Sequence, residues 1–269
     1  ALQVLPQSCE IDDTADYSLD PVGEVSKMPV PFVVQKHRDR ALLLVSRKCH
    51  VYCRFCFRRN LDDGQEPTDQ ELKAAIEYIV NAGVEEVILS GGDPLFLSNK
   101  RLLPILQYLS TRIPVIRIHT RAVVTTPHRV DEDLVAGLSK IPNVWVVIHC
   151  NHRNELNDEV RSVLAKLRNG GIPLLNQSVL LANVNDDPDT LADLSRTLVR
   201  IGVFPYYLHH TDPAQGTSDF RVSLERGLQI HRRLSQMVSG IALPRYVIDP
   251  SDGSGKKDVI AYTSVQENK

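Results

Sequence analysis

Hydrophobic residues along the chain fall into two alternating patterns. Short apolar runs rich in Val, Ile and Leu predict β-strands at 41–46, 85–90, 115–119, 144–149, 174–179 and 203–208. Apolar residues at helical spacing follow these runs and predict helices over 69–82, 99–110, 131–139, 155–169, 188–201 and 223–238. The chain therefore alternates strand and helix, and we expect the one tryptophan, Trp145, to pack in the core.

This alternation predicts an α/β fold, a partial (β/α)6 TIM-like barrel with parallel strands inside and helices outside. The strands are apolar along their whole length, which indicates burial on both faces. Six units are fewer than the eight of a closed barrel, so we expect one open side. We divide the chain into an N-terminal arm at 1–40, the barrel at 41–245 and a C-terminal segment at 246–269.

Polar residues gather where the predicted strands end. Cysteines follow the first strand, Ser90-Gly91-Gly92-Asp93 the second and His119-Thr120-Arg121 the third, while the later strands carry 149–152, 176–178 and 209–212. The carboxyl ends of parallel strands form one face of a barrel, and active sites occupy that face. This placement predicts an active site there. His152 and Asn154 are equally consistent with structural roles in a loop.

Composition narrows the class of protein. The chain has 269 residues, 42% hydrophobic and 24% charged, with a formal net charge of -2. No basic block indicates nucleic acid binding, no apolar run is long enough to cross a membrane, and the first residues do not resemble a signal peptide. Five cysteines, three of them clustered, argue against a disulfide framework and favour the reducing cytoplasm.

The cluster reads CHVYCRFC, with Cys49, Cys53 and Cys56 spaced C-x3-C-x2-C. Structural zinc sites use four ligands, commonly in two pairs from separate segments, and His50 is poorly placed to complete a tetrahedron with its neighbour. A [4Fe–4S] cluster normally takes four thiolates, so three would leave one iron open to a substrate. We favour a catalytic [4Fe–4S] cluster; a zinc-bearing binding module with the same fold is the alternative.

The glycine pair Gly91-Gly92 follows the second strand, with the carboxylate of Asp93 beside it. Glycines at a strand end let the backbone approach a ligand closely. An ordinary turn between strand and helix explains the same residues. Together with the cysteines, we interpret them as part of a ligand site.

The cysteine spacing, with Phe55 before the last cysteine, resembles that of the radical S-adenosylmethionine (SAM) superfamily. Within that superfamily the chain resembles the lysine 2,3-aminomutase family through seven motifs: DRALLLV (39–45), CRFCFRR (53–59), SGGDPL (90–95), HCNHRNE (149–155), NQSVLL (176–181), PYYLHHTDPAQG (205–216) and SGIALP (239–244). The resemblance implies an isomerase of the radical SAM barrel type. Such an enzyme uses SAM, a [4Fe–4S] cluster and pyridoxal 5′-phosphate (PLP) to move the amino group of L-lysine from C2 to C3.

The resemblance also implies roles for individual residues. Those for SAM are Ser90, Gly91, Gly92 and Asp93 at its methionine end, His149 and Gln177 at its ribose, and Arg121 near a carboxylate. Those for PLP are Lys256 in DPSDGSGKK (249–257) as the Schiff-base lysine, with Lys257 as the adjacent alternative, and Arg40 and Lys36 at the phosphate. Those for the substrate are Arg58 at its carboxylate and both Asp212 and Asp249 at its ammonium group.

The chain ends 13 residues after Lys256 and has no cysteine after Cys150. In this it resembles the short members of the family, which prepare β-lysine for elongation factor P. Asp249 instead matches an aspartate of the family members that act on free lysine. Two alternatives therefore stay open: lysine metabolism unrelated to elongation factor P, and a radical reaction on another amino acid. The resemblance implies L-lysine as a small-molecule substrate and an electron donor such as flavodoxin or ferredoxin; an oligomer is compatible with it.

Overall fold

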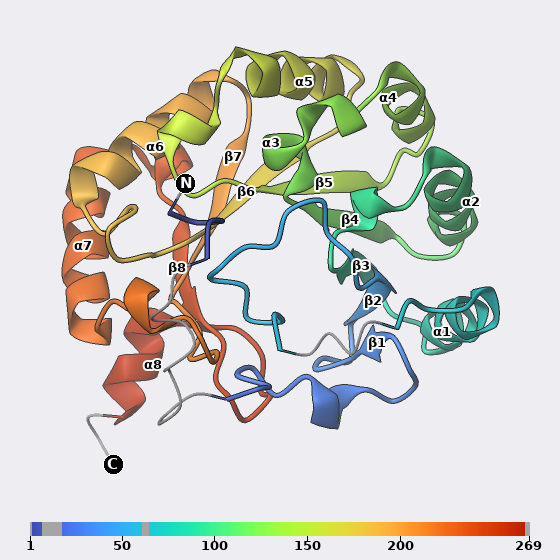
Figure 1. The fold of residues 1–269 in the computed structure, drawn as a ribbon, viewed down its shortest axis with the longest axis horizontal. Coiled ribbons are helices and arrows are strands. Elements are labelled where there is room, and N and C mark those ends of the chain that lie inside the picture. The colour runs from blue at the N-terminus through green and yellow to red at the C-terminus, as the bar shows by residue number, and fades with distance from the viewer. Residues whose placement is uncertain (1, 7–17, 61–64, 267–269) are drawn as a thin grey trace.

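A computed structural model describes residues 2–6, 18–60 and 65–266. Its strands form one sheet in chain order (Figure 1): β1 (Val33–Val34), β2 (Arg40–Ser46), β3 (Glu86–Gly91), β4 (Val115–Thr120), β5 (Val144–His149), β6 (Leu174–Val179), β7 (Phe204–His209), β8 (Arg245–Ile248) and β9 (Lys257–Asp258). Neighbours from β2 to β8 are parallel, whereas β1 and β9 pair antiparallel at the two edges. In the described part of the chain the two edge strands do not pair with each other, so the barrel is open.

Helices cover the outside of the sheet (Figure 1). They are α1 (Asp69–Asn81), α2 (Asn99–Ser110), α3 (Ala122–Thr125), α4 (Glu132–Leu138), α5 (Asp158–Asn169), α6 (Pro188–Arg200), α7 (Leu224–Met237) and α8 (Val259–Gln266). Thr68 begins α1 with a capping box, since its side chain accepts from the backbone N–H of Glu71 and the Glu71 carboxylate accepts in return. The six predicted strand-then-helix units are confirmed, and β8, β9 and α8 extend them.

The main core lies between the strands and α1 to α6. Strand residues on the outer face are buried against the helices, for example Leu43, Leu89, Ile116 and Ile118. A smaller core under α7 surrounds Tyr246. Because hydrophobic burial stabilises a fold roughly in proportion to the apolar area removed from water, these cores hold the strands rigidly. The loops at the strand ends therefore start from rigidly held strands.

The prediction that Trp145 packs in the core is wrong, because 38% of its surface is exposed. Trp145 pairs with Arg117 on the neighbouring strand, and the Arg117 guanidinium lies over the ring of Tyr206 on β7, across the barrel. Paired residues on adjacent strands share a face, so Trp145 points into the barrel near the amino ends of the strands. A barrel with an open side leaves that interior accessible.

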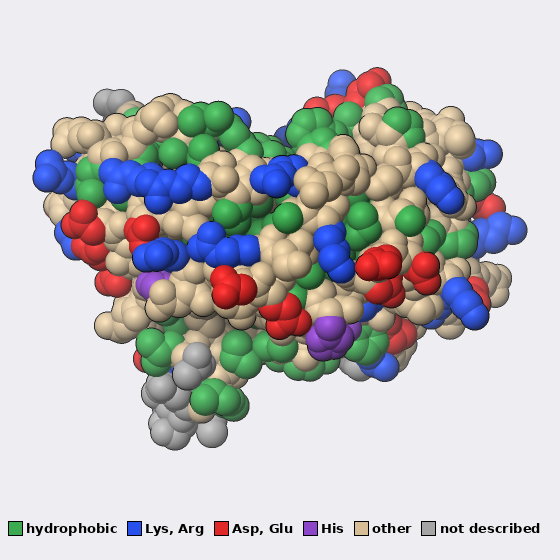
Figure 2. All heavy atoms as spheres, turned by 90° about the horizontal axis from the view of Figure 1, so that it is seen from above, with side chains coloured by type: hydrophobic (Ala, Val, Ile, Leu, Met, Phe, Trp, Pro, Cys, Tyr) green, Lys and Arg blue, Asp and Glu red, His purple; other side chains and the backbone are tan. Residues whose placement is uncertain are grey.

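The predicted arm at 1–40 includes residues 1 and 7–17, which lie outside the described residues. In the described part of the arm, a short 3-10 helix at Val25–Lys27 and β1 lead into the barrel, and β1 joins the same sheet. Figure 2 shows basic and acidic side chains intermixed over the face seen from the side of α5, without a field of one sign. Every helix of the described ranges is too short or too polar to span a lipid bilayer.

Candidate active site

The cysteine loop, residues 47–60, leaves the end of β2 and lies inside the ring of strands in the view of Figure 1. Cys49, Cys53 and Cys56 are each partly buried and are free thiols. The backbone N–H of Cys56 donates to the carbonyl of Cys53 at 3.1 Å, which turns the loop between the last two cysteines. The thiols are close enough to influence one another's charge. The loop therefore presents three thiols to one region at the barrel mouth.

The donor set fits an iron–sulfur cluster. In the described residues no three His, Cys, Asp or Glu side chains converge as ligands of one metal ion would. A [4Fe–4S] cluster takes each thiolate on a different iron, so its ligands need not converge on one point. The guanidinium of Arg121 donates from Nη1 to the sulfur of Cys53 at 3.1 Å, a contact that suits a thiolate.

Gly91 and Gly92 let the backbone at the end of β3 approach the backbone at the start of the cysteine loop closely. A side chain at Gly91 would overlap the carbonyl group of Ser46, and a side chain at Gly92 would overlap those of Arg47 and Lys48. The N–H of Gly92 donates to the carbonyl of Ser46 at 2.7 Å. These glycines thus seat the cysteine loop on the end of β3, and their contact with SAM stays a prediction.

Asp93 lies at the same turn and is buried. Its carboxylate accepts from the hydroxyl of Thr120 at 2.7 Å and from the backbone N–H groups of Leu95, Arg121 and Ala122 at 2.8–2.9 Å. Four donors occupy this carboxylate, so its present role is to join the ends of β3 and β4. A SAM ammonium group beside Asp93 would therefore share an oxygen that already accepts two hydrogen bonds.

The other residues predicted for SAM lie around the cysteine loop. His149 ends β5 and pairs in register with Gln177, which lies two residues before the end of β6, and their contact with SAM stays a prediction. The ring of Phe55 lies 5.3 Å from that of His149, and the Arg121 guanidinium lies 4.8 Å above Phe55. Burial, with the charge of Arg121, lowers the pKa of His149 well below its ordinary value, so this imidazole is neutral.

Arg58 is the predicted anchor for the substrate carboxylate, and one edge of its guanidinium is already bound by Glu24. Its Nε and Nη2 donate to the two oxygens of Glu24, each at 2.7 Å. Its Nη1 donates to the hydroxyl of Ser90 at 3.0 Å and to the carbonyl of Gly91 at 3.2 Å. Sequence analysis missed Glu24, which lies 34 residues away in an irregular segment. A lone acidic residue there carries no sequence signal.

The structure brings the predicted lysine and the two predicted aspartates together. Lys256 Nζ lies 2.9 Å from an oxygen of Asp249, whose side chain is 10% exposed. Burial alone would raise the pKa of Asp249, but the charge and hydrogen bond of Lys256, together with His209 and Lys36, lower it. Asp212 is in the same group: burial, with the charge of Asp249, raises the pKa of Asp212 to about 7. Lys256, Asp249 and Asp212 thus share one site, and among the described residues Asp212 has no cation paired with it alone.

Two residues were predicted at the PLP phosphate. Lys36 donates from Nζ to the carbonyl of Val22 at 2.5 Å, and burial lowers the pKa of Lys36 despite the neighbouring Asp249 and Glu24. Arg40 is 37% exposed and pairs with Asp39 at 3.0 Å, at the amino end of β2. Lys36 therefore lies among the charges of Asp249 and Glu24, whereas Arg40 pairs with Asp39, and the contact of either residue with the PLP phosphate stays a prediction.

Two histidines at strand ends, His119 on β4 and His209 on β7, were noted in the sequence without a role. Each has a buried Nε2 without a hydrogen-bond partner in the described residues. Burial and the charge of Lys256 lower the pKa of His209 to about 3. Burial, with Arg117, likewise lowers that of His119 well below its ordinary value. An unpartnered buried polar atom is costly, so these imidazoles suit a bound polar group beside Lys256.

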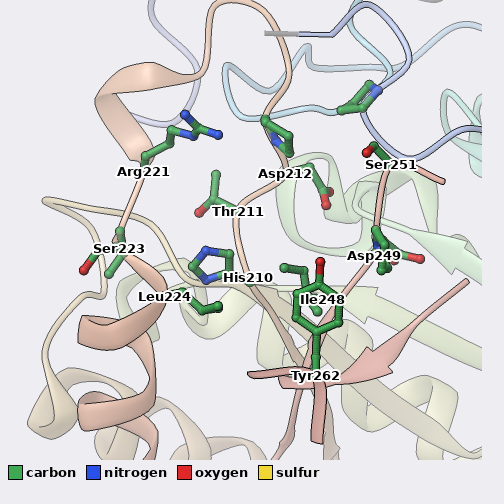
Figure 3. Close-up of a pocket in the computed structure, with 14 residues that line it drawn as sticks. His210, Thr211, Asp212, Arg221, Ser223, Leu224, Ile248, Asp249, Ser251 and Tyr262 are labelled. Carbon is green, nitrogen blue, oxygen red and sulfur yellow. The ribbon is translucent and has the colours of Figure 1, made fainter. Parts of the chain in front are cut away.

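Asp212 and Asp249 also line a cavity of about 510 Å³ between the ends of β7 and β8, the start of α7, and α8 (Figure 3). His210, Ser223 and Tyr262 face the same space. Small-molecule sites commonly enclose roughly 300–1,000 Å³. The two carboxylates therefore border enough space for an amino-acid side chain. Together, the lysine, the cationic neighbours and the orphan imidazoles fit PLP, which needs an amine and donors for its phosphate.

An open parallel barrel with a three-cysteine loop after its first parallel strand defines a class of protein. Residues 43–194, more than half of the chain, match the Radical SAM superfamily. Streptococcus suis SuiB bound to S-adenosylmethionine has a similar fold, with a TM-score of 0.58 and 15% identity over 77% of this chain and 49% of that one. A radical SAM methyltransferase from Sphaerobacter thermophilus gives 0.56 and 19%, over 80% and 68%.

Relatives closer in sequence narrow the class. L-lysine 2,3-aminomutase of Escherichia coli is 40% identical over 248 residues, 90% of this chain and 72% of that protein. The Buchnera aphidicola protein of that name is 38% identical over 253 residues, 92% and 74%. That of Methanococcus maripaludis is 40% identical over 246 residues, 90% of this chain, which spans only 57% of it. The chain belongs to the lysine 2,3-aminomutase family of radical SAM proteins.

Proposed function

We propose that the protein is an isomerase that moves the α-amino group of L-lysine from C2 to C3, using SAM, a [4Fe–4S] cluster and PLP. The observation that supports this most is the charge group at the barrel mouth. Asp212 and Asp249 lie beside Lys256, and Arg58 of the cysteine loop is within range of the Asp249 charge. A substrate with a carboxylate at one end and an ammonium group at the other matches this arrangement.

When bound, the cluster and SAM supply a carbon radical that removes hydrogen from the substrate, and PLP supplies the carbonyl carbon that holds the migrating nitrogen. Cys49, Cys53 and Cys56 would hold the cluster, while Ser90 to Asp93, Arg121, His149 and Gln177 would surround SAM. Lys256 would hold PLP, with Lys36 and Arg40 toward its phosphate.

The chain's own residues would fix the substrate between two anchors. Arg58 would donate to the α-carboxylate from the guanidinium edge that Glu24 leaves open. Asp212 and Asp249 would accept from the ε-ammonium group, since a pair of buried carboxylates needs a cation. Two anchors at opposite ends would hold the reacting carbons in one place, which lowers the entropic cost of the reaction. Neutral His119 and His209 would add polar contacts without charge.

The experiment is anaerobic turnover of the protein reconstituted with iron, sulfide and PLP. SAM, a strong reductant and L-lysine are added, and β-lysine is sought by mass spectrometry. We expect product from the parent protein and none from Lys256→Ala. Cleavage of SAM without any β-lysine would retain the superfamily chemistry and reject the substrate; other amino acids would then be assayed.

We further propose that the β-lysine serves elongation factor P. A one-electron donor such as flavodoxin or ferredoxin would reduce the cluster, and the reaction would take place in the cytoplasm. A strain without the gene should lose β-lysylated elongation factor P, measured by intact-protein mass spectrometry. Unchanged modification would favour free-lysine metabolism instead.

A further inference from the structure

Glu24 forms a buried ion pair that the proposed reaction does not yet use. The residue is 3% exposed, although it lies in an irregular segment before β1. Its two oxygens accept from Nε and Nη2 of Arg58 at 2.7 Å each. Such a two-point pair between a carboxylate and a guanidinium fixes the plane of the guanidinium as well as its position.

The backbone around Glu24 is itself held in place. The Asp20 carboxylate accepts from the N–H groups of Glu24 at 2.8 Å and Val25 at 2.9 Å, which anchors the turn. Gly23, with φ of 66°, packs against the loop that carries Lys256: a side chain there would lie 2.7 Å from the carbonyl oxygen of Ser251. Glu24 therefore joins the cysteine loop to the lysine loop through a rigid segment.

Counting donors shows what Arg58 has left for a ligand. A guanidinium has five N–H donors. Glu24 takes one from Nε and one from Nη2, and the Nη1 group donates to Ser90 and Gly91. One Nη2 N–H has no acceptor among the described residues, on the edge of the guanidinium away from Nε. The orientation that Glu24 imposes decides where that donor points.

We propose that Glu24 is a positioning residue that orients Arg58 to receive the α-carboxylate of the substrate amino acid. This inference rests on the proposed function, since it takes Arg58 as the carboxylate anchor. Removing the Glu24 charge has opposite consequences under two physical accounts. If Glu24 merely neutralised Arg58, its loss would strengthen the attraction for a carboxylate. If Glu24 orients Arg58, its loss weakens binding, because the hydrogen bond depends on direction.

The test compares two ligands of the protein reconstituted with cluster and PLP. L-lysine and cadaverine, which is lysine without its carboxylate, are measured by equilibrium dialysis with the parent protein and with Glu24→Gln. We expect Glu24→Gln to weaken L-lysine binding about tenfold, the usual scale for one charge-assisted hydrogen bond, and to leave cadaverine binding unchanged. Glutamine has the same shape, and iron content and melting temperature report whether the fold is retained.

A matched control is Glu66→Gln, because Glu66 anchors the start of the same loop through the Ser46 hydroxyl and the Arg47 N–H, each at 2.8 Å. It should not change the preference for L-lysine over cadaverine. Tighter L-lysine binding by Glu24→Gln, no change, or equal weakening of both ligands would each overturn the inference. Arg58→Met distinguishes failure of the Glu24 inference from failure of the proposed function. If Arg58→Met still prefers L-lysine to cadaverine, Arg58 is not the carboxylate anchor.

Discussion

Lys256 and Asp249 form an ion pair of 2.9 Å in the charge group at the barrel mouth. The amine of Lys256 cannot hold PLP covalently and remain an ammonium partner of Asp249. If Lys256 holds PLP as proposed, Asp249 would lose this ammonium partner, and the ε-ammonium group of the substrate would replace it. The pair would then link cofactor loading to the selection of a cationic side chain.

The first prediction concerns the identity of the PLP lysine. Both lysines are exposed, but Lys256 pairs with Asp249, whereas the Nζ of Lys257 lies 5.9 Å from the ring centre of Tyr262. Borohydride reduction of the PLP-loaded protein, followed by peptide mass mapping, should place the adduct on Lys256. Lys257→Ala should keep the adduct and Lys256→Ala should lose it. An adduct that persists in Lys256→Ala would move the assignment to Lys257.

The second prediction concerns Asp212 and pH. Its folded pKa is about 7 against an ordinary 3.8, because of burial and Asp249. Between these values the folded state binds more protons than the unfolded state, so the free energy of unfolding falls as pH rises from about 4 to about 7. Lys256, Lys36 and Glu24 also face this carboxylate. Asp212→Asn should therefore raise the melting temperature of the lysine-free protein at pH 8 and change it little near pH 4.

Ligand binding should show the same ionisation with the opposite sign. Above pH 7 Asp212 is charged and attracts an ammonium group, so L-lysine affinity should increase from pH 6 to pH 8 in the parent protein. Asp212→Asn should flatten this dependence in equilibrium dialysis. The same slope in both proteins would show that another group controls it.

The third prediction concerns the choice of side chain. Asp249→Asn removes the negative charge that attracts the substrate ammonium group and replaces one acceptor oxygen with an amide donor, so L-lysine binding should weaken by at least about tenfold. Norleucine has no ε-amine, and its binding should not weaken. Dialysis of both ligands measures the preference; equal weakening of the two would mean that Asp249 supports the fold or the lysine loop instead.

The fourth prediction concerns the contact between arm and lysine loop. Gly253 has φ of 70°, and a side chain there would lie 2.9 Å from the carbonyl oxygen of Gly23. Gly253→Ala should destabilise the protein by about 1–3 kcal/mol through backbone strain, with the clash in addition. Gly171→Ala is the control, because Gly171 has φ of 77° and open space around it. Urea unfolding should show a greater loss for Gly253→Ala; equal losses would mean that the contact is unimportant.

The fifth prediction concerns iron. Alanine at Cys49, Cys53 or Cys56 should abolish most iron binding after reconstitution, because each thiolate would hold one iron of the proposed cluster. Cys150→Ala should retain it, since the Cys150 thiol is buried and donates to the carbonyl of His152 at 3.4 Å. Iron content and the visible absorbance of the cluster measure both. Iron loss in Cys150→Ala alone would contradict the assignment.

Sequence pattern predicted the regular part of this fold well, because strands buried on both faces and one-sided helices leave periodic signals. It missed β8 and α8, and also β1 and β9, which are two residues long and form only as edges of an existing sheet. It wrongly placed Trp145 in the core, because nothing in the local sequence pattern distinguishes a residue that faces an open barrel interior from a core residue. The family resemblance predicted site roles for Lys256, Asp212 and Asp249, and the structure brings these three residues together.

Long-range partners were beyond sequence reasoning. Nothing near Glu24 indicates that it meets Arg58, and nothing near Asp93 indicates that it accepts four hydrogen bonds from β3 and β4 loops. The glycines after β3 were expected to admit a ligand, and they also admit the cysteine loop. Such contacts depend on how distant segments pack, which composition and spacing do not encode.

The measurement that tests the central claim most directly is turnover of L-lysine labelled with ¹⁵N at its α-amino group, under the anaerobic conditions described above. We predict β-lysine with the label on the nitrogen at C3, and no labelled β-lysine from Lys256→Ala. A protein that binds its cluster and cleaves SAM, yet returns lysine with the label still at C2, would contradict the proposed reaction.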